Sequence, residues 1–95
     1  MALFVDNATL VEPFSGSALT HAGKPAIRSC CEQMMAQPRP PDFLLTVDRV
    51  DSDGDVVVAE WTCASQVMPA PMRGIDRYVI RGGMIERLEI TLRGG

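Results

Sequence analysis

The sequence predicts an α+β fold in which one main helix packs against a curved antiparallel sheet of about five strands. Three observations carry this prediction. Helical periodicity is clear only within residues 24–37, the segments after residue 42 alternate as strands do, and tight turns separate those segments. Because the chain has 95 residues, we expect one small domain over residues 1–95.

The first 23 residues are expected to hold one strand. Residues 1–7 are interpreted as a last helical turn or the tail of a helix, and residues 8–14 as a short strand. Pro13 limits this strand, because proline has no amide hydrogen to donate to a neighbouring strand. Residues 15–23 are rich in small side chains and are expected to form a loop.

Residues 24–37 are expected to form the helix. Pro25 suits the first helical turn, where a missing amide hydrogen costs nothing. Apolar side chains then recur at helical spacing, at Ile27, Cys30, Cys31, Met34 and Met35. Three prolines within residues 38–41 end the helix.

The remaining residues are expected to form two hairpins. Residues 43–50 and 56–65 flank an acidic turn, and residues 74–92 fold around Gly82 and Gly83. A Gly-Gly pair supplies the positive backbone dihedrals that a two-residue hairpin turn needs. The predicted sheet therefore has four consecutive antiparallel strands after the helix.

Asp76 is the most informative residue of the second hairpin. Side chains alternate across a strand, so Asp76 and Tyr78 share one face, while Leu88, Ile90 and Leu92 form an apolar row on the next strand. If this row marks the concave side, a carboxylate points into an apolar pocket. Carboxylates are rarely buried without a partner or a function.

Composition and charge exclude several function classes. The net charge is −3 and the nine cationic residues are scattered, so we expect no nucleic-acid partner. No apolar run reaches the length of a membrane span, and the first residues do not resemble a signal peptide. The three cysteines have no regular spacing, which indicates neither a disulfide scaffold nor a metal site. We expect a cytoplasmic protein without cofactor or metal.

Three short segments, taken in order, resemble a known superfamily. They are residues 3–14, the Gly-Lys-Pro-Ala-Ile-Arg stretch at 23–28, and residues 74–78 with 83–85. Together they resemble the nuclear-transport-factor-2-like superfamily, and its SnoaL-like and ketosteroid-isomerase-like branches in particular. The resemblance implies a cone-shaped sheet around an apolar pocket, commonly in dimers, and if Met1 is the true start we expect the usual N-terminal helix to be absent. Because that would leave an apolar face open, we expect a homodimer, or a partner segment, to cover it.

The resemblance also implies roles for two acids. Glu12, which precedes Pro13, corresponds to the general base of ketosteroid isomerases, and Asp76 to the protonated acid that donates a hydrogen bond to the developing oxyanion. Alternatively, both acids are structural. Tyr78 either replaces the tyrosine of the missing helix or packs in the core, which is the commoner use of a strand tyrosine. The expected pocket-lining residues are Phe14, Trp61, Met72, Tyr78, Leu88 and Ile90.

Two function hypotheses follow. The first is a domain that binds a small apolar molecule, in its sharper form a cofactor-free isomerase or lyase that transfers a proton next to a carbonyl. The second is a non-catalytic dimerisation or ligand-binding module of the same fold. His21 is expected to be a structural or solvated loop residue, and a nucleophilic pair of His21 with Cys63 has no motif to support it.

Overall fold

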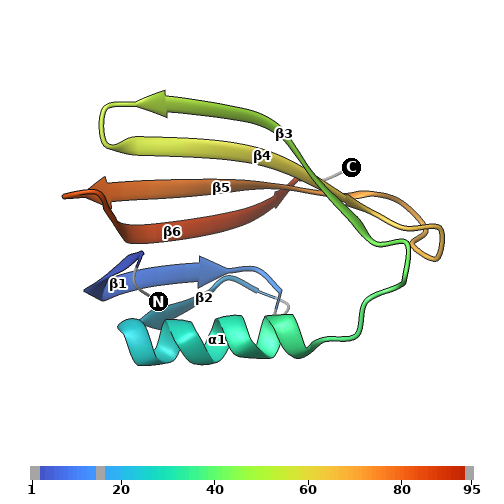
Figure 1. Cartoon of the computed structure of the whole chain (residues 1–95), viewed down its shortest axis with the longest axis horizontal. Coiled ribbons are helices and arrows are strands. Elements are labelled where there is room, and N and C mark those ends of the chain that lie inside the picture. The colour runs from blue at the N-terminus through green and yellow to red at the C-terminus, as the bar shows by residue number, and fades with distance from the viewer. Residues whose placement is uncertain (1–2, 15–16, 94–95) are drawn as a thin grey trace.

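The computed structural model describes residues 3–14 and 17–93 and confirms the predicted α+β class (Figure 1). Within these residues it has one helix and a curved sheet of six strands, one more than the approximate number expected. The elements are β1 (Phe4–Glu12), β2 (Leu19–Ala22), α1 (Lys24–Ala36), β3 (Leu44–Asp53), β4 (Val56–Ala64), β5 (Met72–Arg81) and β6 (Met84–Arg93). No helix among the described residues has the length and hydropathy needed to cross a membrane.

The sheet has the order β2-β1-β6-β5-β4-β3. Every neighbouring pair is antiparallel except β1 and β6, which run parallel. Figure 1 shows α1 against β1 and β2 on one side of the sheet, with β3 and β4 far from the helix. The helix therefore covers only part of the face that it packs on.

The N-terminal segment differs from the sequence-based expectation. Residues 4–7 belong to β1 and are not helical, and residues 19–22 form β2 within the expected loop. Residues 1–2 and 15–16 of these two segments lie outside the described residues. Both differences arise from strand pairing: the amide of the distant Ile85 donates to the carbonyl of Leu3 at 2.7 Å, and β2 pairs antiparallel with the nearby residues 9–12 of β1. Such tertiary pairing overrides weak local preferences.

Helix α1 and both hairpins follow the predictions closely. The helix begins directly after Gly23, with Pro25 in its first turn, and ends one residue earlier than expected. The β3–β4 hairpin turns at Gly54 and Asp55, so both strands extend further into the acidic segment than expected. The β5–β6 hairpin turns at Gly82 and Gly83, whose φ angles are 58° and 78°. A β-branched or bulky residue rarely adopts such angles.

The core lies between α1 and the part of the sheet that β1 and β6 form. Ile27 and Cys30 of the helix pack against Phe4, Ala8 and Leu10 of β1. Partly buried side chains of β6 complete this cluster, at Ile85, Leu88 and Ile90. In contrast, every residue of β3 is exposed, including the apolar Leu44, Leu45, Val47 and Val50. The core is therefore concentrated at one end of the sheet.

Gly74 permits close packing of an aromatic ring on β5. It pairs with Trp61 of β4, and the Trp61 indole lies so close over it that an added Cβ would overlap the ring. We expect Gly74→Ala to displace the indole and to lower the free energy of unfolding by about 1–3 kcal/mol, the usual cost of overpacking. Chemical denaturation measures this change.

Making the same substitution in a second variant protein separates the clash with the Trp61 ring from a general effect on the backbone. In a Trp61→Leu protein the ring is absent, so adding Gly74→Ala should cost much less than it does in the natural chain. Equal costs in the two backgrounds would show that the close approach of the indole is not what requires glycine.

Candidate functional site

A hollow of about 530 Å³ opens between α1 and the part of the sheet that the helix leaves uncovered. We call it the larger hollow. Its lining residues are Phe14, Cys31, Met34, Met35, Arg39, Leu45, Val47, Ala59, Trp61, Cys63, Asp76, Tyr78 and Ile90. Only two of these carry a formal charge, Arg39 and Asp76, and the other walls are largely apolar. An apolar hollow with a few polar groups is the usual composition of a small-molecule site.

Asp76 is held in this hollow by two aromatic donors. The indole Nε1 of Trp61 donates to its Oδ1 at 2.9 Å, and the hydroxyl of Tyr78 donates to its Oδ2 at 3.2 Å. Trp61 reaches Asp76 because its ring lies over Gly74. Both oxygens of Asp76 thus accept hydrogen bonds in this structure, whereas the role implied by the family resemblance requires a proton on one of them.

Tyr78 is a half-buried phenol whose acidity is strongly reduced. Burial, and then the charge and the hydrogen bond of Asp76, raise the pKa of Tyr78 to about 12. Each of these effects disfavours a negative charge on the phenol oxygen. Tyr78 therefore remains a hydrogen-bond donor at any pH well below 12.

A second hollow, of about 430 Å³, lies around the end of β1, and we call it the smaller hollow. Glu12, Cys30 and His21 all line it, from β1, α1 and β2 respectively. Glu12 is only 4% exposed, and its Oε2 lies 4.0 Å from Nε2 of His21. Burial, followed by the charges of Glu12 and Cys31, raises the pKa of the Cys30 thiol. Phe14 and Met34 line both hollows, so the two adjoin.

The strand register determines where Glu12 and Asp76 lie relative to each other. Val11 pairs with Glu89, so Glu12 follows alongside Ile90, and Ile90 pairs with Asp76 on its other side. Neighbouring strands lie about 4.8 Å apart, which places the Cα atoms of Glu12 and Asp76 about 10 Å from each other. Both side chains line hollows that α1 also lines. The two acids therefore lie on the same side of the sheet.

The sequence-predicted residues divide between several places. Phe14, Trp61, Asp76, Tyr78 and Ile90 line the larger hollow, and Glu12 lines the smaller one together with Phe14. The two remaining residues lie elsewhere. Leu88 packs in the core cluster under α1, and Met72 is 37% exposed at the start of β5.

Sequence reasoning missed the neighbours of Glu12. His21 was expected in a loop without an evident partner, but it lies on β2 beside Glu12, while Cys63 lines the other hollow. Cys30 was expected to be a packing residue of the helix. Cys30 and Met34 are four residues apart, which places both side chains on one face of the helix, and Met34 lines the same hollow. This spacing is the one signal in the sequence for the position of Cys30.

Comparison with known proteins agrees with this architecture. A family model described as SnoaL-like domain matches residues 1–88. The chain belongs to the SnoaL-like domain family. This membership confirms the resemblance noted in the sequence. No curated protein matches the chain.

Solved structures show the same fold for this SnoaL-like domain. A candidate ketosteroid isomerase from Kribbella flavida DSM 17836 has a TM-score of 0.71 at 16% identity, over 99% of this chain and 63% of that one. A steroid delta-isomerase from Pseudomonas aeruginosa has a TM-score of 0.73 at 21% identity, over 98% and 64%. An NTF2-like protein of unknown function from Cytophaga hutchinsonii ATCC 33406 has a TM-score of 0.77 at 20% identity, over 97% and 80%. The chain thus spans less than two thirds of the two isomerase-type structures.

The ionisation of Tyr78 can be followed directly, because it is the only tyrosine in the chain. In the folded protein we expect its tyrosinate absorbance to appear with a midpoint near pH 12, as the raised pKa requires. Asp76→Asn removes the neighbouring charge and should lower this midpoint, while burial keeps it above the ordinary value of 10.0. A midpoint near 10 in protein whose circular dichroism is still native would contradict the proposed surroundings of Tyr78.

The raised pKa of Tyr78 also determines the direction in which the stability of the fold changes with pH. The unfolded chain loses the tyrosine proton near pH 10 and the folded chain near pH 12, so the folded state binds more protons between these values. The contribution of Tyr78 to stability is therefore complete below pH 10 and is lost as the pH rises toward 12.

Proposed function

We propose that this SnoaL-like domain binds a small, largely apolar molecule in the larger hollow, with the polar end of the molecule at Asp76. The observation that carries this proposal is a carboxylate, held by Trp61 and Tyr78, among walls that are otherwise mostly apolar. A volume of about 530 Å³ lies within the range of small-molecule sites. Apolar walls supply affinity by burial, and the few polar groups orient the ligand.

The hydrogen bonds of Asp76 restrict the ligand's polar end. Each carboxylate oxygen has two lone pairs, so Asp76 can accept a further bond from a ligand hydroxyl or N–H group. A ligand carbonyl needs a donor instead. The Tyr78 hydroxyl meets this need when it rotates from Asp76 to the ligand, since its pKa of about 12 keeps it protonated.

Blocking the larger hollow tests the binding function. Trp61 is the only tryptophan and lines this hollow, so its fluorescence reports occupancy by a probe such as a β,γ-unsaturated ketosteroid. Ala59 also lines the hollow and pairs with Asp76. We expect Ala59→Phe to fill the space and to weaken binding of the probe at least tenfold, about 1.4 kcal/mol.

The matched control is Ala64→Phe. This makes the same chemical change on the same strand, but alternation places residue 64 on the opposite face from residue 59. The control should bind the probe as the natural chain does. Saturating probe that leaves Trp61 fluorescence unchanged, or equal weakening by both substitutions, would refute the binding site.

Proton transfer next to a carbonyl is the second candidate function, and the shared register of the two acids favours it. Glu12 and Asp76 flank Ile90 on one side of the sheet, about 10 Å apart at their Cα atoms. A ligand carbonyl at Tyr78 would leave its neighbouring carbon to be deprotonated from the Glu12 side. The steroid delta-isomerase from Pseudomonas aeruginosa has the same fold, which makes this chemistry a reasonable comparison. In the non-catalytic alternative both acids only stabilise the fold.

Removing the basic oxygen of Glu12 tests this second function. Glutamine cannot accept the substrate proton, so Glu12→Gln should slow exchange of the carbonyl ligand's α-hydrogens with deuterium by about 100-fold or more. Ligand affinity should change little, since Glu12 lines the other hollow. Glu32→Gln, on the exposed side of α1, is the matched control and should exchange at the natural rate. Exchange that is no faster than in buffer, or is equal in both variants, would support the non-catalytic module.

The expected homodimer also stays a proposal. β3 forms the outer edge of the sheet, and it exposes four large apolar side chains. Such an edge is a surface that another chain commonly covers. Sedimentation at micromolar concentration distinguishes a dimer from a monomer. The cytoplasmic location remains an expectation from the sequence.

A further inference from the structure

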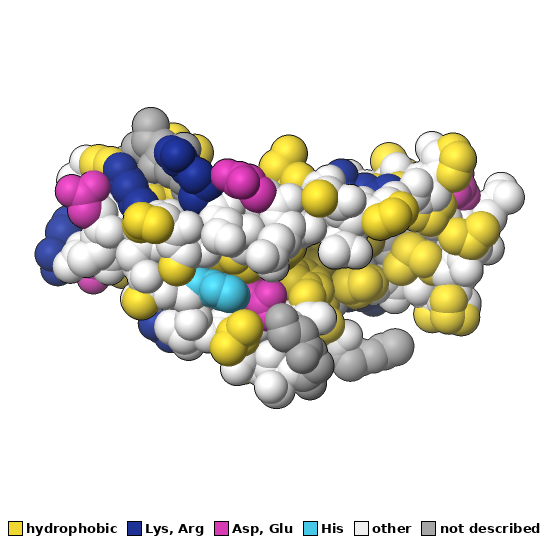
Figure 2. Space-filling model, turned by 90° about the horizontal axis from the view of Figure 1, so that it is seen from below, with side chains coloured by type: hydrophobic (Ala, Val, Ile, Leu, Met, Phe, Trp, Pro, Cys, Tyr) yellow, Lys and Arg dark blue, Asp and Glu magenta, His cyan; other side chains and the backbone are white. Residues whose placement is uncertain are grey.

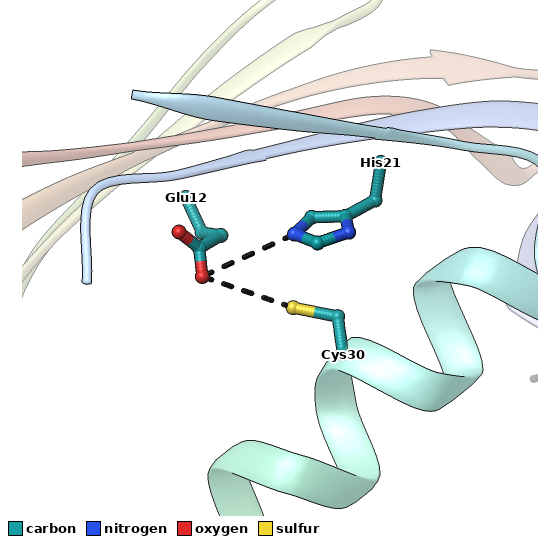
Figure 3. A group of neighbouring side chains, drawn as sticks. All are labelled: Glu12, His21 and Cys30. Atoms are coloured by element: carbon teal, nitrogen blue, oxygen red, sulfur yellow. Dashed lines mark hydrogen bonds and ion pairs between the residues drawn. The ribbon is translucent and has the colours of Figure 1, made fainter. Parts of the chain in front are cut away.

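We propose that Glu12, His21 and Cys30 form a zinc-binding site. One ligand atom of each residue lies within 4.8 Å of the others, and Figure 3 shows the three side chains pointing toward one another from β1, β2 and α1. Oε2 of Glu12 lies 4.0 Å from Nε2 of His21 and 4.0 Å from Sγ of Cys30. Three different classes of zinc ligand thus converge on one point.

These separations are close to those of a tetrahedral zinc site. Zinc binds sulfur at about 2.3 Å and nitrogen or oxygen at about 2.0–2.2 Å, which places the ligand atoms about 3.5 Å from one another. The structure has 4.0 Å for the two pairs that involve Glu12. Side-chain shifts of less than about 1 Å are enough to bring all three atoms to bonding distance.

The chemistry of the donor set favours zinc. Thiolate and imidazole together select borderline-soft ions such as zinc, whereas magnesium and calcium prefer oxygen ligands alone. Nε2 of His21 is buried and, among the described residues, has no hydrogen-bond partner. A buried nitrogen in that state costs free energy, and coordination would remove the cost. The Cys30 proton would leave to solvent as the thiolate binds the metal.

The position of the three ligands leaves one coordination site open. Glu12 and Cys30 are 4% and 6% exposed, and all three residues line the smaller hollow. Three protein ligands beside an open space are the arrangement of a catalytic zinc, in which water or substrate takes the fourth position. Figure 2 shows the single histidine, in cyan, at the surface of this face with an acidic side chain beside it.

We expect zinc binding at this site to be independent of ligand binding in the larger hollow. Coordination would occupy the carboxylate that the proton-transfer candidate uses, so zinc is expected to inhibit that exchange reaction and to leave probe binding unchanged. The site also joins α1 to β1 and β2, so zinc should stabilise the fold.

Cobalt(II) is the probe that tests the site, because a thiolate ligand gives a charge-transfer absorption that carboxylate and imidazole do not. Chelator-treated protein should bind one cobalt ion per chain with this absorption, and zinc should displace it. Cys30→Ser should abolish the absorption. His21→Gln should weaken zinc binding by more than the roughly 10- to 100-fold that loss of an outer-shell partner costs.

Cys31→Ser is the matched control, since Cys31 is the adjacent and less buried cysteine of the same helix. It should keep the absorption and the zinc-induced rise in melting temperature, while His21→Gln should lose that rise. Circular dichroism checks that each variant is folded. The proposal is overturned if folded natural protein shows no thiolate absorption, if His21→Gln binds zinc as tightly as the natural chain, or if Cys31→Ser loses the absorption as Cys30→Ser does.

Discussion

The parallel pairing of β1 with β6 is the constraint on which the rest of the structure depends. Helix α1 lies against β1 and β2, and β3 to β6 form a separate antiparallel series, so this one ladder joins the two parts. It sets Leu10 beside Leu88 under the helix, and so completes the core. A slip of one residue in this ladder would turn Glu12 away from the side of the sheet that Asp76 faces.

The uneven cover that α1 gives the sheet explains both hollows. The helix buries Leu10 and Ile27 completely, yet Leu45 and Val47 of β3 remain exposed on the far part of the sheet. The uncovered part becomes the larger hollow, and the end of the helix forms a wall of the smaller one. Such spaces reduce the core of a small domain. Each apolar side chain left in solvent lacks the stabilising free energy of about 25 cal/mol per Å² that its burial would provide. A ligand or a second chain would recover part of this.

Much of the fold could be predicted because its signals are local. Helix α1 has its own periodicity with prolines at both ends, and the Gly82-Gly83 turn requires dihedrals that glycine adopts readily. The start of β1 could not be predicted in this way, since it pairs with residues near Ile85, far along the chain. β2 pairs with the nearby residues 9–12 of β1, although the small side chains of residues 15–23 indicate a loop. The same limit applies to the site. Alternation places Asp76 and Tyr78 on one face, but no local pattern brings His21 to Glu12 and Cys30.

The sequence by itself determined the class of the fold, the helix, both hairpins and the face on which Asp76 lies. These depend on contacts within a strand, a turn or a helix, where spacing along the chain equals position in space. Only the tertiary structure decided that Asp76 accepts hydrogen bonds from Trp61 and Tyr78, and that Glu12 shares a hollow with His21 and Cys30. These contacts depend on how separate strands pair and where the helix packs, and strand register and helix packing arise from the whole chain together.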